Sequence, residues 1–138
     1  MKELISVNGQ TYPWKSREMY ARLMGCYPDE TGFRHNSNRS QKILAILHNA
    51  SPDLARHEVL GINLFGADDQ NARNAIWTEV DRMIKVLKAS RLYEQIAIYS
   101  VTGQGYLLSP KLPEKGIITL PDGQQLFVQG DRLVQKLK

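Results

Sequence analysis

Residues 70–89 constrain the fold more than any other segment, because their pattern predicts a long helix with one apolar face. Apolar side chains recur there at intervals of three and four residues, and the opposite side is polar or charged. The apolar stripe comprises Ala72, Ala75, Ile76, Val80, Met83, Ile84 and Leu87. Such a helix is stable in water only when its stripe packs against another layer. The rest of the chain must therefore supply a layer that covers the stripe.

The segment after this helix predicts a strand that continues into a tight hairpin, residues 99–109 (YSVTGQGYLLS). Gly103 and Gly105 lie between two apolar runs, and glycine adopts a positive φ without steric cost. Hairpins of this kind commonly only complete a sheet. The alternative interpretation is that the hairpin is the wing of a nucleic-acid-binding domain.

The other segments predict short helices and further hairpins. The Asn8-Gly9 turn separates two expected strands near the start, and residues 121–123 mark a hairpin turn in the tail. Expected helices span about residues 16–25, 37–49 and 52–66. In the last of these, the expected inward side chains are Leu54, Val59, Leu60, Leu64 and Phe65. This order of elements predicts the α+β class.

Composition is that of one globular domain. Of the 138 residues, 42% are apolar and 23% are charged, which is near the globular average. The single cysteine, Cys26, cannot support a disulfide framework, and the sequence shows neither a long apolar run nor a signal peptide. We therefore expect a cytoplasmic protein that does not bind membranes.

The net charge of +4 is unevenly distributed. Residues 34–57 and 70–91 are basic, whereas residues 58–69 between them are acidic. Two basic segments can form a footprint on a polyanion, or they can be ordinary solvated helix faces. The distribution leaves both interpretations open.

From about residue 37 to residue 109 the chain resembles the winged helix-turn-helix domain of the OmpR/PhoB response-regulator family. The most specific match is the hairpin, in which Gly103, Gly105 and Tyr106 stand at the glycine and tyrosine positions of the family's wing. Thr102, in contrast, stands where the wing commonly has an arginine. The preceding helices also match at several positions, namely Arg56, Glu58, Leu60, Phe65, Gly66, Ile76, Thr78, Val80, Met83 and Leu87.

The resemblance implies a single α+β domain with a winged-helix core over residues 37–109. Residues 1–36 would add an amino-terminal hairpin and a short helix, with no receiver domain, and residues 110–138 a carboxy-terminal hairpin extension. The helix over 70–89 would then enter the major groove of double-stranded DNA. The turn over 101–106 would meet the adjacent backbone or the minor groove.

We therefore expect a small stand-alone transcriptional regulator, bacterial or phage, that binds double-stranded DNA. Arginine and lysine suit guanine or phosphate, asparagine suits adenine, and threonine suits the thymine methyl group. The expected DNA-binding residues are Arg73, Asn74, Trp77, Thr78, Arg82, Lys85, Lys88, Thr102, Gln104 and Arg39.

The same residues support a second hypothesis, a protein-interaction module that binds a partner or forms a homodimer through the face around Trp77. A large aromatic residue on a helix surface can anchor a protein partner, or it can pack beneath a neighbouring segment. Asp81 repels phosphate, and its expected role is an ion pair with Lys85 one turn later. Arg39 either contacts a phosphate group near the start of a helix or lies in a flexible polar loop.

Catalysis finds little support in the sequence. His35, His48 and His57 lack a metal-ligand spacing, and one cysteine cannot form a zinc motif. The glycines of the hairpin do not open a helix, so they form no dinucleotide fingerprint. We expect no enzymatic activity, no cofactor, no metal and no small-molecule substrate.

Overall fold

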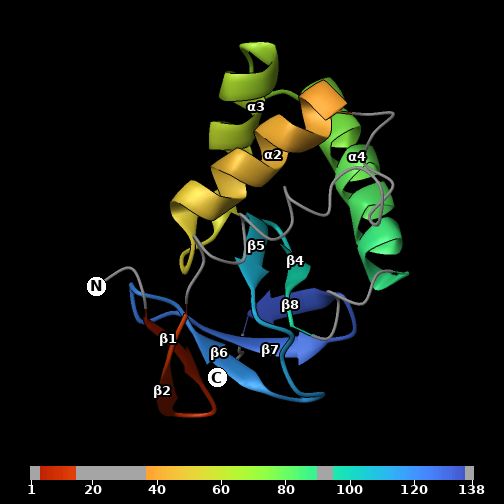
Figure 1. Ribbon diagram of the computed structural model, residues 1–138. Coiled ribbons are helices and arrows are strands. Elements are labelled where there is room, and N and C mark those ends of the chain that lie inside the picture. The colour runs from red at the N-terminus through yellow and green to blue at the C-terminus, as the bar shows by residue number, and fades with distance from the viewer. Residues whose placement is uncertain (1–3, 15–36, 90–94, 136–138) are drawn as a thin grey trace.

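The computed structural model describes residues 4–14, 37–89 and 95–135, which form three helices and one eight-stranded sheet (Figure 1). The helices are α2 (Ser37–Ala50), α3 (His57–Phe65) and α4 (Gln70–Lys88). The strands are β1 (Leu4–Val7), β2 (Gln10–Pro13), β3 (Ala55–Arg56), β4 (Ala97–Val101), β5 (Gly105–Ser109), β6 (Ile117–Thr119), β7 (Gln125–Gln129) and β8 (Arg132–Gln135). The structure is therefore α+β.

The sheet has the order β2-β1-β6-β7-β8-β4-β5-β3 and curls into a half-barrel. The helices gather at one end of the molecule and β1, β2, β6 and β7 at the other, with β4 and β5 between them (Figure 1). Neighbouring strands are antiparallel except for β4 and β8, which run parallel. One buried core connects the helices, the hairpin of β4 and β5, and the strands β1, β6, β7 and β8.

Helix α4 forms where the sequence predicts it. Five residues of its stripe are almost fully buried, namely Ala72, Ile76, Val80, Met83 and Leu87. Its first turn is capped by Asp69, whose Oδ1 accepts a hydrogen bond from the Ala72 amide at 2.8 Å. Burial of this stripe fixes the helix against the rest of the core.

The prediction of a winged helix-turn-helix core is wrong. A wing projects from a small sheet, but β4 and β5 are internal strands of the eight-stranded sheet, with β8 on one side and β3 on the other. Every residue of β5 is buried, as are four of the five in β4. The pairing of Val101 with Leu133 adds the carboxy-terminal strands to the same sheet. The carboxy-terminal strands β6, β7 and β8 therefore belong to the same sheet as the hairpin.

The predicted helix over residues 52–66 is shorter than expected. Ala55 and Arg56 are extended instead, because they pair with Tyr106 and Gly105 of β5. Helix α3 begins only at His57 and ends at Gly66, whose φ of 73° closes the helix.

The hairpin of β1 and β2 surrounds the Asn8-Gly9 turn, and β6 and β7 flank residues 121–123, as the turn signals predict. The expected helix over residues 16–25 lies outside the described residues. Trp14, just after β2, is buried and donates through Nε1 to Ser51 Oγ at 2.6 Å. Ser51 Oγ in turn donates to the Leu108 carbonyl at 2.9 Å, so three distant segments are tied together.

The close approach of β3 to β5 yields a first prediction. A Cβ on Gly105 would overlap the carbonyl oxygen of Ala55, and both residues belong to a paired backbone that cannot move apart freely. We expect Gly105→Ala to lower the unfolding free energy by about 3 kcal/mol in urea denaturation. Gly103→Ala is the matched control, because Gly103 has open space around it and only its φ of 76° is unfavourable. A loss near 1 kcal/mol for both variants would contradict the close approach.

Candidate functional site

The outer face of α4 carries most of the residues that sequence reasoning assigned to DNA. This face comprises the exposed residues Gln70, Asn71, Arg73, Asn74, Trp77, Thr78, Lys85 and Lys88. Arg82 lies beside it and is half-buried. The structure therefore brings seven of the ten expected residues together on one helix.

The basic side chains of this helix are held by carboxylates of the same chain. Lys85 Nζ lies 3.1 Å from Asp81 Oδ2, which confirms the pairing that the sequence predicts. The other pairs are Arg73 with Asp68 at 2.9 Å, Arg82 with Glu79 at 2.8 Å and Lys88 with Asp131 at 2.6 Å. Hydrogen bonding to Arg73 also lowers the pKa of Asp68, so that pair stays charged over a wide pH range. The positive charge of the face is thus largely balanced.

The polar side chains of α4 are also engaged within the helix. Asn74 Oδ1 accepts a hydrogen bond from Gln70 Nε2 at 2.8 Å. Thr78 Oγ1 donates to the Asn74 carbonyl at 2.9 Å. A ligand on this face has to compete with these local bonds.

Trp77 is the most prominent apolar feature of the outer face. Its side chain is 57% exposed, so the interpretation in which it packs beneath a neighbouring segment is wrong. Helical spacing places Arg73 and Asp81 one turn to either side of it. The exposed indole of Trp77 is therefore flanked by Arg73 and Asp81, both of which form ion pairs with other residues.

Helix α3 exposes three more large apolar side chains, Val59, Ile62 and Phe65. Sequence reasoning placed Val59 and Phe65 in the core, and that prediction is wrong because both side chains are exposed. The signal was present in the sequence: five of the nine residues of α3 are large and apolar, more than one inward face can hold. Arg39, expected at a phosphate, lies with Cζ 5.0 Å from the Phe65 ring.

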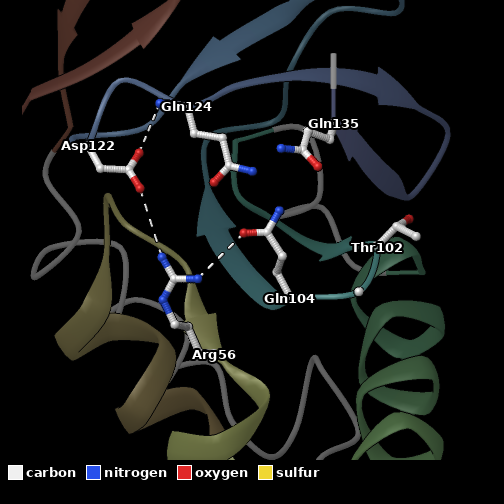
Figure 2. Close-up of a pocket in the computed structure, with 7 residues that line it drawn as sticks. Arg56, Thr102, Gln104, Asp122, Gln124 and Gln135 are labelled. Carbon is white, nitrogen blue, oxygen red and sulfur yellow. Dashed lines mark hydrogen bonds and ion pairs between the residues drawn. The ribbon is translucent and has the colours of Figure 1, made fainter. Parts of the chain in front are cut away.

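Thr102 and Gln104 lie in a polar depression that we name the Arg56 cleft (Figure 2). It has a volume of about 690 Å³ and is open to solvent. Its lining residues are Arg56, Thr102, Gly103, Gln104, Asp122, Gln124 and Gln135. Sequence reasoning missed its other members because they come from β3, the turn between β6 and β7, and the end of β8.

The chemistry of the Arg56 cleft is hydrogen bonding without a net charge. Arg56 lies 3.9 Å from Asp122 and donates through Nη1 to Gln104 Oε1 at 3.5 Å, both long contacts. In Figure 2 the amide groups of Gln104, Gln124 and Gln135 gather around the same space. Within the described ranges, no group of three histidine, cysteine, aspartate or glutamate side chains could hold a metal ion.

Beneath the cleft, His57 and Tyr106 form an edge-to-face ring pair, with centroids 5.6 Å apart. Burial lowers the pKa of His57, and the charge of Arg73 lowers it further. Burial raises the pKa of Tyr106 to about 12, with a smaller contribution from the charge of Asp81. The pair is therefore neutral at physiological pH and holds the start of α3 against β5.

The raised pKa of Tyr106 predicts a loss of stability in alkaline solution. An unfolded tyrosine ionises near pH ~10, so above that pH the unfolded state releases a proton that the folded state retains until about pH 12. The unfolding free energy should fall across this window, by at most about 1.4 kcal/mol per pH unit. Urea denaturation at several pH values should show a smaller fall in Tyr106→Phe. The control Tyr12→Phe, at an exposed residue, should keep the full pH dependence; equal falls in both variants would contradict the assignment.

None of the helices in the described ranges combines the length and the apolar character that crossing a bilayer requires. Comparison of the chain with protein-family models, with curated proteins and with solved structures gives no match. The geometry of the exposed residues is therefore the evidence for the function.

Proposed function

We propose that the chain is a protein-interaction module that binds its partner through the helical layer. The observation that carries this proposal is the position of the exposed large apolar side chains. In the described part of the chain there are five, of which Val59, Ile62, Phe65 and Trp77 lie on α3 and α4, and only Tyr12 lies elsewhere. Apolar side chains gathered on one layer and surrounded by polar residues mark protein interfaces.

The charge balance supports a protein partner over a polyanion. Residues 37–89 carry seven basic and six acidic residues, and residues 95–135 carry three of each. Binding to nucleic acid draws most of its affinity from uncompensated positive charge. Residues 37–89 and 95–135 have almost no uncompensated positive charge, because the excess of basic residues lies in the segments outside them.

Trp77 is suited to be the anchor of such an interface. Tryptophan is enriched among the residues that contribute most to binding, and these are usually surrounded by polar contacts that exclude water. The ion pairs of Arg73 with Asp68 and of Lys85 with Asp81 provide this rim. The partner is another protein or a second copy of the chain.

A capture experiment tests the proposal. The tagged chain is incubated with nuclease-treated cell lysate, and each captured protein is purified and bound again in isolation. We expect Trp77→Ala to weaken binding of the partner tenfold or more, whereas the matched control Tyr12→Ala leaves it unchanged. Light scattering identifies the case in which the partner is a second copy. Capture that requires nucleic acid, or that is indifferent to Trp77→Ala, would contradict the proposal.

Double-stranded DNA is a second candidate, favoured by one observation. Asn74, Thr78 and Lys85 are all exposed on the outer face of α4, and these residue types read base edges when a helix lies in the major groove. The ion pair of Lys85 is half-exposed and weak, so phosphate can displace Asp81 from it.

Fluorescence anisotropy with a labelled duplex, at increasing salt, tests this candidate. If α4 binds DNA, affinity should fall steeply with salt, and Lys85→Ala should reduce the salt slope by about 1. Lys115→Ala, in the turn before β6, is the matched control. Absence of salt-dependent binding would remove DNA from consideration and leave the protein-interaction proposal as it stands.

A further inference from the structure

The surface between α2 and α3 contains an apolar groove, which we name the α2–α3 groove. Its volume is about 410 Å³. The lining residues are Ile46, Asn49, Ala50, Leu54, Ala55, Arg56, Val59 and Asn63. Leu54 and Ala55 are buried, whereas Val59 is 43% exposed. Five of the eight lining side chains are therefore apolar, and the polar ones are two amides and one arginine.

The groove extends along both helices. On α2, Arg39 and Lys42 precede Ile46 by seven and four residues, so helical spacing places all three on one stripe. On α3, Ile62 lies one turn after Val59 and is 59% exposed, although it is not among the residues that line the groove. The contact of Arg39 with the Phe65 ring brings the start of α2 to the end of α3. The two helices on either side of the groove therefore run antiparallel.

Positive charge stands at both ends of this surface. Arg39 lies over Phe65 at one end, with Lys42 one turn along α2. Arg56 lines the other end, and its contacts with Asp122 and Gln104 are long enough to leave it able to bind another acceptor. One acidic side chain stands near this surface: Glu58 is exposed on α3 one turn before Ile62, and like Arg39 and Lys42 it lies outside the groove lining itself.

We propose that the α2–α3 groove binds an amphipathic helix of a partner protein, with acidic residues on either side of its apolar face. The apolar face lies on Ile46, Val59 and Ile62, and the acidic residues contact Arg39, Lys42 and Arg56. This inference rests on the proposed function, for which it supplies a docking site and the chemistry of the partner. Helix α3 is nine residues long, so at ~1.5 Å per residue the apolar wall spans roughly 14 Å, about two and a half turns of a bound helix.

A basic or an uncharged helix fits this surface less well. A basic helix would place its charges against three cations, and like charges at an interface are repulsive. An uncharged helix would cover the apolar area without offering an acceptor to the cations at its ends. The Arg56 cleft, by comparison, has no large apolar side chain in its lining and offers nothing to the apolar face of a helix.

Selection from a displayed library of helical peptides, with the flanking positions randomised, tests the inference. We expect the full chain to enrich peptides with apolar residues at intervals of three and four and with aspartate or glutamate near both ends. By fluorescence anisotropy, Ile46→Ser and Arg39→Glu should each weaken binding of a selected peptide about tenfold. The double variant Arg39→Glu, Arg56→Glu should prefer the same peptide with lysine in place of each acid.

Matched controls separate local effects from general ones. Lys115→Glu and Arg132→Glu make the same change of charge outside the groove and should leave binding unchanged; thermal unfolding confirms that every variant is folded. If Arg56→Glu disturbs the contact with Asp122, Arg39→Glu alone is used to measure the change in peptide preference. Enrichment of basic flanks, enrichment of no helix, or equal loss in groove and control variants would overturn the inference.

The partner found by capture distinguishes this inference from the proposed function. If Trp77→Ala abolishes capture while Ile46→Ser and Arg39→Glu do not, the module binds a protein but not through the α2–α3 groove. If neither Trp77→Ala nor the groove variants change capture, both proposals fail. If Trp77→Ala and the groove variants both reduce capture, the partner contacts both Trp77 and the groove, and both proposals stand. If only the groove variants reduce it, the groove is the docking site and Trp77 is not the anchor.

Discussion

The parallel pairing of β4 with β8 is the interaction on which the rest of the architecture depends. The Ser100 amide donates to the Asp131 carbonyl at 3.0 Å, and the Thr102 amide donates to the Leu133 carbonyl at 3.1 Å. These bonds join the central hairpin to the carboxy-terminal strands, while β5 joins it to β3. With a neighbour on each outer side, both strands of the hairpin become internal strands of the sheet. The helices then pack around a buried hairpin, and the hairpin cannot project into a ligand as a wing does.

The elements that the sequence predicts well are those with a local physical signal. The stripe of α4 and the pair of Asp81 with Lys85 depend on residues within one or two turns. The pairing of β4 with β8 joins segments about thirty residues apart, and no local pattern encodes it. One signal was present, because residues 105–109 are apolar or small without alternation, which is typical of a strand buried on both faces.

The residues misplaced by sequence reasoning are the ones that make the candidate site. Periodicity assigned Val59 and Phe65 to the core together with Leu60 and Leu64, although one face of a helix cannot bury so much apolar surface. The structure places Ala55 and Arg56 in a strand, and α3 begins at His57. Leu60 is completely buried, and Val59, Ile62 and Phe65 remain exposed. Helix α3 therefore carries an exposed apolar wall beside its buried face.

Arg56 connects this wall to the sheet. Its backbone belongs to β3, and its side chain reaches Gln104 in the hairpin turn and Asp122 in the turn between β6 and β7. Both contacts are long, so they direct the side chain toward the sheet and leave it able to bind another acceptor. Under the proposed docking, the sheet places a cation at the end of the α2–α3 groove without itself contacting the partner.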